Sequence, residues 1–200
     1  MFDQKEYHDE DFSDALILEE SLESMVFVRC RFQDADFAQI RLDRCRFEEC
    51  SFEGANFRGA LIRGCAFLNC EFRFADCGGA EFFNCKMTGS DFTDVRFTMA
   101  SFGPGDWSYT VLEGAEFSGY RFEEISFRGA DLTRADFSKA VVSRCDFSGA
   151  NLNGANFRKA DLRGSEMHSV DFLTFDFTGA RIDLDLAVTV AESLGAKVTL

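Results

Sequence analysis

ADLTRADFSKA, residues 130–140, decides the fold, because a small residue, a polar residue and a large apolar residue return in it every five positions. An α-helix would repeat its apolar face every three or four residues, and a β-strand every two. A period of five fits neither element. It indicates an architecture of short structural repeats instead.

The five-residue register extends over nine-tenths of the chain. Large apolar residues occupy nearly all of its 37 positions from Phe2 to Ile182, without any insertion, and 22 of the 25 phenylalanines lie on it. Phe74, Phe83 and Phe175 lie off the register. Two residues before each large position, 15 of 36 places hold Ala and 7 hold Cys. Each repeat therefore places one small and one large side chain inward and three mostly polar ones outward.

Residues twenty positions apart resemble one another, which predicts a coil of four repeats with four walls. One column of large residues reads Phe12, Phe32, Phe52, Phe72, Phe92, Leu112, Leu132, Leu152 and Phe172. We call the five residues centred on each member of this column the Phe12 wall, and name the Ile17 wall in the same way. Glycine recurs two places after the large residue, where a type II turn requires a positive φ.

The repeats ADFSK, ANLNG, ANFRK, ADLRG and SDFTD resemble the motif of the pentapeptide repeat family: a small residue, Asp or Asn, Leu or Phe, and two variable residues. The resemblance implies an all-β solenoid, a right-handed quadrilateral β-helix, for which the register gives about nine coils over residues 1–182. A solenoid has no internal boundary, so we expect one repeat domain there. Residues 183–200 form a separate tail of one helix and a short extended segment.

Little in the sequence supports catalysis. Seven of the eight cysteines fill small inward positions and Cys77 fills a large one, which is typical of reduced, buried thiols. The two histidines, His8 and His168, fall eight coils apart on one wall, too far to share a catalytic site. We predict no enzyme activity, no cofactor and no metal. The absence of a secretory signal or a long apolar run favours a cytoplasmic protein without a membrane segment.

Charge is unevenly distributed over the predicted walls. The formal net charge is −14, of which the Phe12 wall carries −8 and the Ile17 wall −1. One interpretation is that this acidity only maintains solubility, and the other is that it binds a basic partner. Its sign disfavours direct binding of nucleic acid. The candidate partner-binding residues on the Phe12 wall are Glu53, Glu71, Asp91, Asp94, Glu113, Asp131 and Asp171.

The tail DLDLAVTVAESLGAKVTL, residues 183–200, leaves the five-residue register. Asp183 or Asp185 is suited to begin a helix, and Gly195 is suited to end it. The helix would be apolar on nearly every side, which predicts that both faces are buried. We therefore expect a two-fold homodimer through the C-terminal ends. Its predicted interface residues are Phe175, Leu184, Leu186, Val190 and Leu194.

The resemblance also implies a function. Topoisomerase-protecting members of the family end in such a helix, dimerise through it, and bind DNA gyrase or topoisomerase IV in place of DNA. They protect the enzyme from quinolones or natural-product poisons, in antibiotic resistance or self-immunity. This chain has no insertion in its repeats and so resembles the loop-free members. The alternative is a pentapeptide repeat scaffold for protein–protein interaction with an unrelated partner.

One irregular segment, residues 100–127, contains the only proline and the only tryptophan. Its small positions hold Gly105, Tyr120 and Ile125. Either the turn type changes there, or a contact patch lies near Trp107 and Tyr109. Trp107 is on the register, which predicts that it is buried.

Overall fold

The computed structural model describes residues 2–17 and 19–199, which form two compact units, Met1–Asp106 and Trp107–Leu200. Both units are built from parallel β-coils of twenty residues, and an α-helix follows the last coil of the second unit. The predicted β-solenoid with a C-terminal helix is confirmed. Residues 1 and 200, the outer ends of the predicted domains, lie outside the described residues.

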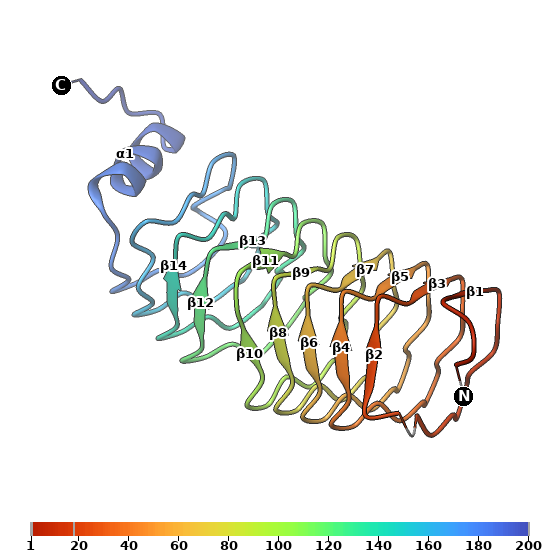
Figure 1. The fold of residues 1–200 in the computed structure, drawn as a ribbon. Coiled ribbons are helices and arrows are strands. Elements are labelled where there is room, and N and C mark those ends of the chain that lie inside the picture. Colours follow the sequence, from red (N-terminus) through yellow and green to blue (C-terminus); the bar gives the residue numbers. More distant parts are fainter. Residues whose placement is uncertain (1, 18, 200) are drawn as a thin grey trace. The chain divides into compact units, whose positions relative to one another are not determined.

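The first unit carries two ladders of short parallel strands (Figure 1). One ladder consists of β1 (Glu6–His8), β3 (Val26–Val28), β5 (Arg46–Glu48), β7 (Ala66–Leu68), β9 (Cys85–Lys86) and β11 (Gly105–Asp106). The other consists of β2 (Ser21–Glu23), β4 (Arg41–Asp43), β6 (Leu61–Arg63), β8 (Glu81–Phe83) and β10 (Ser101–Phe102). Partners in both ladders are twenty residues apart, as Phe27 with Phe47 and Leu42 with Ile62.

The other two walls of the first unit are joined by single bridges with the same spacing. Asp11, Arg31, Ser51, Glu71 and Asp91 are bridged in turn, and so are residues 16, 36, 56, 76 and 96. Each coil therefore has four walls, which confirms the predicted coil of four repeats.

The second unit continues the pattern with fewer strands. It contains β12 (Arg121–Glu123) paired with β14 (Val141–Ser143), together with β13 (Ile125–Ser126). Single bridges such as Asp131 to Asn151 and Asp161 to Arg181 link its remaining coils. Over the described residues the strands account for about seven coils, against the nine predicted. The difference arises because backbone pairing near the C-terminus shortens from strands to single bridges, although the five-residue register reaches residue 182.

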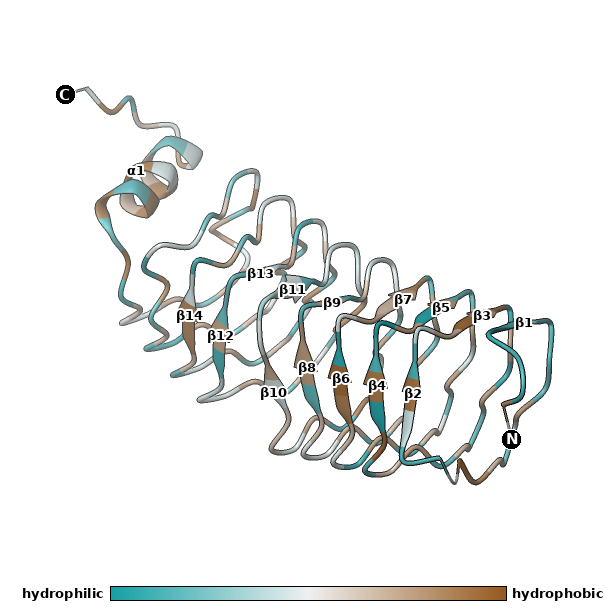
Figure 2. Cartoon of the chain, in the orientation of Figure 1, coloured by the Kyte–Doolittle hydropathy of each residue, from teal (hydrophilic) through white to brown (hydrophobic). Residues whose placement is uncertain are grey.

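The interior of each coil is filled by the residues that the register places inward. In the first unit, Phe12, Phe32, Phe52, Phe72 and Phe92 stack face to face with centroid separations of 4.7–5.1 Å. This separation is close to the spacing of paired strands, so the coil itself imposes the stacking. Along β2, β4 and β5, polar residues flank one buried apolar residue (Figure 2), because successive side chains point to opposite faces.

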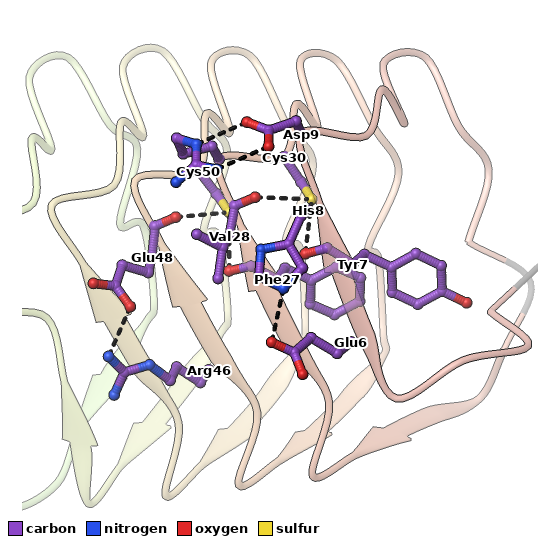
Figure 3. Close-up of polar contacts among 11 residues, drawn as sticks. Glu6, Tyr7, His8, Asp9, Phe27, Val28, Cys30, Arg46, Glu48 and Cys50 are labelled. Atoms are coloured by element: carbon purple, nitrogen blue, oxygen red, sulfur yellow. Dashed lines mark hydrogen bonds and ion pairs between the residues drawn. The ribbon is translucent and has the colours of Figure 1, made fainter.

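All eight cysteines are free and buried, as predicted. The Cys30 thiol donates to the carbonyl oxygens of Tyr7 and Val28, each at 3.6 Å, while charged side chains lie on the outer surface (Figure 3). Burial raises the pKa of the Cys77 thiol and raises that of Cys145 to about 12. Both thiols therefore remain protonated at neutral pH.

The turns between walls have one repeated conformation. All twelve glycines that lie two residues after a large position have positive φ, as predicted. Among the residues that the structure describes, twenty non-glycine residues also have positive φ, with values of 52–62°. Pro104 occupies such a place, where its ring fixes a negative φ, so the turn type changes there. Trp107 is buried, as predicted.

Helix α1 spans Leu184–Ser193 and begins and ends as the sequence indicates. The Asp183 carboxylate accepts the Leu186 N–H at 3.0 Å, so Asp183 is the N-cap. At the other end Gly195 has a φ of 88°, and the Gly195 and Ala196 N–H groups donate back into the last turn. This pattern is a Schellman motif, which satisfies carbonyl groups left unpaired by the end of the helix.

Candidate partner-binding surface

The aspartate or asparagine that precedes a large residue has a structural role in several repeats. The Asp91 carboxylate accepts the Thr93 N–H at 2.8 Å and the Thr93 hydroxyl at 2.6 Å. Asp131 binds Thr133 in the same way, and Asp171 accepts the Leu173 N–H at 3.0 Å. Asparagine does the same elsewhere, as Asn56 with the Arg58 N–H. The Asp or Asn of the repeat thus satisfies a turn N–H that the coil leaves unpaired.

The predicted partner-binding residues divide between the two units. Glu53, Glu71, Asp91 and Asp94 lie in the first unit, and Glu113, Asp131 and Asp171 lie in the second. Glu53, Glu71 and Asp94 are exposed, and within the described residues their carboxylates make neither an ion pair nor a hydrogen bond. Asp91, Asp131 and Asp171 face outward but are held by their turns. None of these positions is part of the core.

Few cations neutralise the Phe12 wall. It contains eleven acidic and three basic residues. Arg31 pairs with Asp11 at 2.6 Å, Arg134 pairs with Glu113, and Arg73 lies over the Phe74 ring. In the first unit this wall carries a net charge of −6, and in the second unit −2. The strongest uncompensated acidity is therefore on the first unit.

The other walls pair their acids with arginines from neighbouring coils. On the Ile17 wall, Arg58 and Arg96 both contact Asp76, at 3.2 and 3.0 Å. Although burial raises the pKa of Asp76, the Gly78 N–H and these two arginines hold the pKa below its ordinary value. Farther along the chain, Arg158 contacts Asp176 at 3.1 Å. Unlike the Phe12 wall, this wall presents a nearly neutral surface.

The predicted interface residues of the tail fall into two groups. Phe175 and Leu186 are buried within the second unit and contribute to its own core. Leu184 is 75% exposed, Leu194 is 56% exposed and Val190 is half-buried. Leu173, which the sequence did not single out, is 80% exposed and lines a hollow of about 450 Å³ together with Leu194. An apolar surface therefore remains at this end of the unit.

Side chains suited to catalysis or metal binding are scattered. Among the described residues, no group of three or more His, Cys, Asp or Glu side chains is placed to hold a metal ion. His8 hydrogen-bonds Glu6 at 2.7 Å on the surface of the first unit (Figure 3), and His168 lies in the second unit. Over residues 2–17 and 19–199 no helix has the length and apolar character needed to cross a membrane.

Three exposed aromatic side chains are further surface features. Phe74, Phe83 and Tyr109 are each about half-exposed or more. The sequence gives a signal for two of them, because Phe74 and Phe83 lie off the five-residue register. It gives no signal for their surroundings, which depend on residues twenty positions away.

Comparison with known proteins agrees with this architecture. The sequence matches the family profile described as Pentapeptide repeats in eight copies, and the matched stretches include residues 30–102 and 110–179. No curated protein sequence matches the chain at a significant level. Trypsin-treated QnrB1, a plasmid-mediated fluoroquinolone resistance protein, is similar with a TM-score of 0.83 and 26% identity over 97% of both chains. A second trypsin-treated QnrB1 structure gives a TM-score of 0.80 at the same identity and coverage.

A more distant likeness concerns the fold alone. HetL, a pentapeptide repeat protein involved in heterocyst differentiation regulation from the cyanobacterium Nostoc sp. strain PCC 7120, is 20% identical with a TM-score of 0.50. The similarity covers 88% of this chain and 84% of HetL.

Proposed function

The chain belongs to the pentapeptide repeat family, and from that membership we propose that it is a binding protein whose acidic wall takes the place of DNA on a type II topoisomerase. The partner is DNA gyrase or topoisomerase IV, and binding protects the enzyme from quinolone or natural-product poisons. No reaction is catalysed. The observation that carries the proposal is the similarity to a fluoroquinolone resistance protein over 97% of both chains.

The Phe12 wall of the first unit supplies the electrostatic support. Five coils contribute to this wall, and at about 4.8 Å per coil they extend roughly 24 Å. They carry a net charge of −6, about one charge per 4 Å. Duplex DNA carries one charge per about 1.7 Å. The wall thus has a negative charge density lower than that of duplex DNA, but of the same sign, and a basic DNA-binding groove would attract it. Complementary charge of this kind mainly raises the association rate and sets orientation.

A homodimer is the second part of the proposal. Leu173, Leu184 and Leu194 are more exposed than apolar residues of a stable monomer need to be, and all three lie near the C-terminal end of the second unit. Pairing two copies about a two-fold axis would cover the same patch on both. Leu186 supports this surface from beneath, because its burial holds α1 against its own unit.

The proposal is tested with purified protein and DNA gyrase. We expect direct binding in a pull-down, and partial recovery of supercoiling when the protein is added to gyrase inhibited by a fluoroquinolone. Absence of binding to both gyrase and topoisomerase IV would contradict the proposal. It would favour a scaffold for another partner.

A pair of matched variants tests the wall itself. The first neutralises the Phe12 wall with Asp91→Asn, Asp94→Asn, Glu113→Gln and Asp131→Asn. The control neutralises the Ile17 wall with Asp36→Asn, Asp76→Asn, Glu116→Gln and Asp136→Asn. We expect only the first to weaken gyrase binding and to flatten its salt dependence. Equal weakening by both would mean that net charge matters and the wall does not.

A further inference from the structure

Phe74 is out of place for a side chain of its size. It occupies the turn place where φ is positive, with a φ of 62°, and the residue is 53% exposed. That backbone conformation suits glycine and is unfavourable for bulky residues. The Phe74 N–H also makes a long hydrogen bond, 3.3 Å to the Thr93 carbonyl, where the corresponding bonds of Asp34 and Gly54 are 2.9 Å. The coil gains little from this side chain.

The other exposed aromatic residues have a structural explanation that Phe74 lacks. A Cβ atom at Gly103 would lie 2.4 Å from the Phe83 ring, and one at Gly129 would lie 2.6 Å from the Tyr109 ring. Each ring therefore rests on the glycine twenty residues later, in the next coil, which is a known way to cover glycine in sheets. Twenty residues after Phe74 the chain has Asp94 instead of glycine. Phe74 covers no such site.

The surroundings of Phe74 are acidic and include one cation. Asp94 holds the same turn place one coil later, and Glu53 lies one coil earlier beside Gly54. Glu71 precedes Phe74 on the same wall and is exposed. The Arg73 guanidinium lies 5.6 Å from the ring centroid, so the ring already accepts a cation on its face. Exposed carboxylates around an aromatic face suit a guanidinium or ammonium group brought by a partner.

We propose that Phe74 is the anchor at which the acidic wall of the first unit binds a basic protein surface, taking an arginine or lysine side chain against its ring between Glu53, Glu71 and Asp94. This inference rests on the proposed function, since it locates the contact on the wall that faces the topoisomerase. Charge complementarity selects the occupant: the surrounding wall carries −6, and aromatic residues in desolvated contacts dominate many interfaces.

Phe74→Gly is the test, and Met99→Gly is its matched control. Met99 has the same turn place in the same unit, a φ of 61° and 85% exposure, but lies on the Ile17 wall. Both substitutions place glycine at a position of positive φ, so both variants should keep a melting temperature at or above that of the unmodified chain. We expect Phe74→Gly to weaken gyrase binding about tenfold and Met99→Gly to leave it unchanged. Equal binding by both variants would overturn the inference.

A second probe separates this inference from the proposed function. Octa-arginine peptide is titrated calorimetrically into the unmodified chain and both variants at low salt. We expect Phe74→Gly to weaken peptide binding about threefold to tenfold, in the range of a cation–π contact, whether or not gyrase is the partner. If the unmodified chain does not bind gyrase but Phe74→Gly still weakens peptide binding, only the proposed function is contradicted. A changed mass for Phe74→Gly in light scattering would assign the ring to self-association and overturn the inference.

Discussion

The two units build the same coil from different side chains. In Met1–Asp106, 14 of 21 large positions are Phe and six small positions are Cys, and the unit carries 21 acidic and 11 basic residues. In Trp107–Leu200, 8 of 16 large positions are Phe, four are Leu, eight small positions are Ala and one is Cys, with 14 acidic and 10 basic residues. The first unit thus combines stacked rings with an acidic exterior, and the second combines a smaller-residue interior with an apolar end.

This difference shows which features of a residue the coil specifies. The column that stacks as five phenylalanines in the first unit reads Leu112, Leu132, Leu152 and Phe172 in the second, and all three leucines are buried. For a residue to fit the interior of the coil, an inward direction and an approximate size are therefore sufficient. Ring stacking adds about 0.5–1.5 kcal/mol of stability per pair. The outward positions remain free to differ, which allows the first unit to concentrate charge and the second to expose leucine.

The largest expected effect concerns self-association, which we assign to the second unit. Replacing Leu184 and Leu194 together by Asp should convert the proposed homodimer to monomers. Burying each leucine stabilises by about 1.5–3 kcal/mol, so two from each copy contribute roughly 6 kcal/mol or more. Light scattering measures the mass, and Met99→Asp in the first unit is the control that should leave it unchanged. A single-chain mass for the unmodified protein would remove the dimer from the proposal.

The next effect concerns the interior of the first unit. Phe52 is fully buried and stacks on Phe32 and Phe72 at 5.1 and 4.9 Å. Phe52→Ala should lower the free energy of unfolding by about 3–5 kcal/mol, because it removes both contacts and leaves a cavity. Phe52→Leu introduces the leucine that the second unit has in this column, and it should lower the free energy of unfolding by about 1.5 kcal/mol. Urea unfolding distinguishes them, and equal losses would mean that the first unit depends on ring stacking itself.

The sequence could predict what the period determines. A period of five over 37 positions identifies the inward residues, the four walls and the turns, because every coil imposes the same requirements. The helix caps at Asp183 and Gly195 followed from local chemistry in the same way. Contacts across coils were less predictable, such as the convergence of Arg58 and Arg96 on Asp76. Those depend on side-chain reach between residues about twenty positions apart, which the period does not encode.

A smaller effect divides the acidic wall between the units. Glu53→Gln, Glu71→Gln, Asp91→Asn and Asp94→Asn neutralise it on the first unit, and Glu113→Gln, Asp131→Asn and Asp171→Asn do so on the second. Asn keeps the turn bond of Asp, as Asn56 shows, so the fold should be unaffected. We expect the first set to weaken gyrase binding about tenfold at 0.1 M salt and the second about twofold. Surface plasmon resonance measures both, and a reversed order would move the contact to the second unit.

The smallest effect concerns Asp183, whose charge acts on its own unit instead of a partner. The Leu186 and Gly164 N–H groups donate to its carboxylate and lower its pKa. Its contribution to stability is therefore complete above the ordinary Asp pKa of about 4 and is lost as the pH falls through the lowered value. Asp183→Asn retains a cap but removes the charge near the helix N-terminus, so it should destabilise by about 0.5 kcal/mol at pH 7. The melting temperatures of variant and unmodified chain should converge toward pH 3. A gap that persists there would show that the cap acts by geometry alone. Asp94→Asn, which neutralises an exposed acid of the first unit without such donors, is the control substitution.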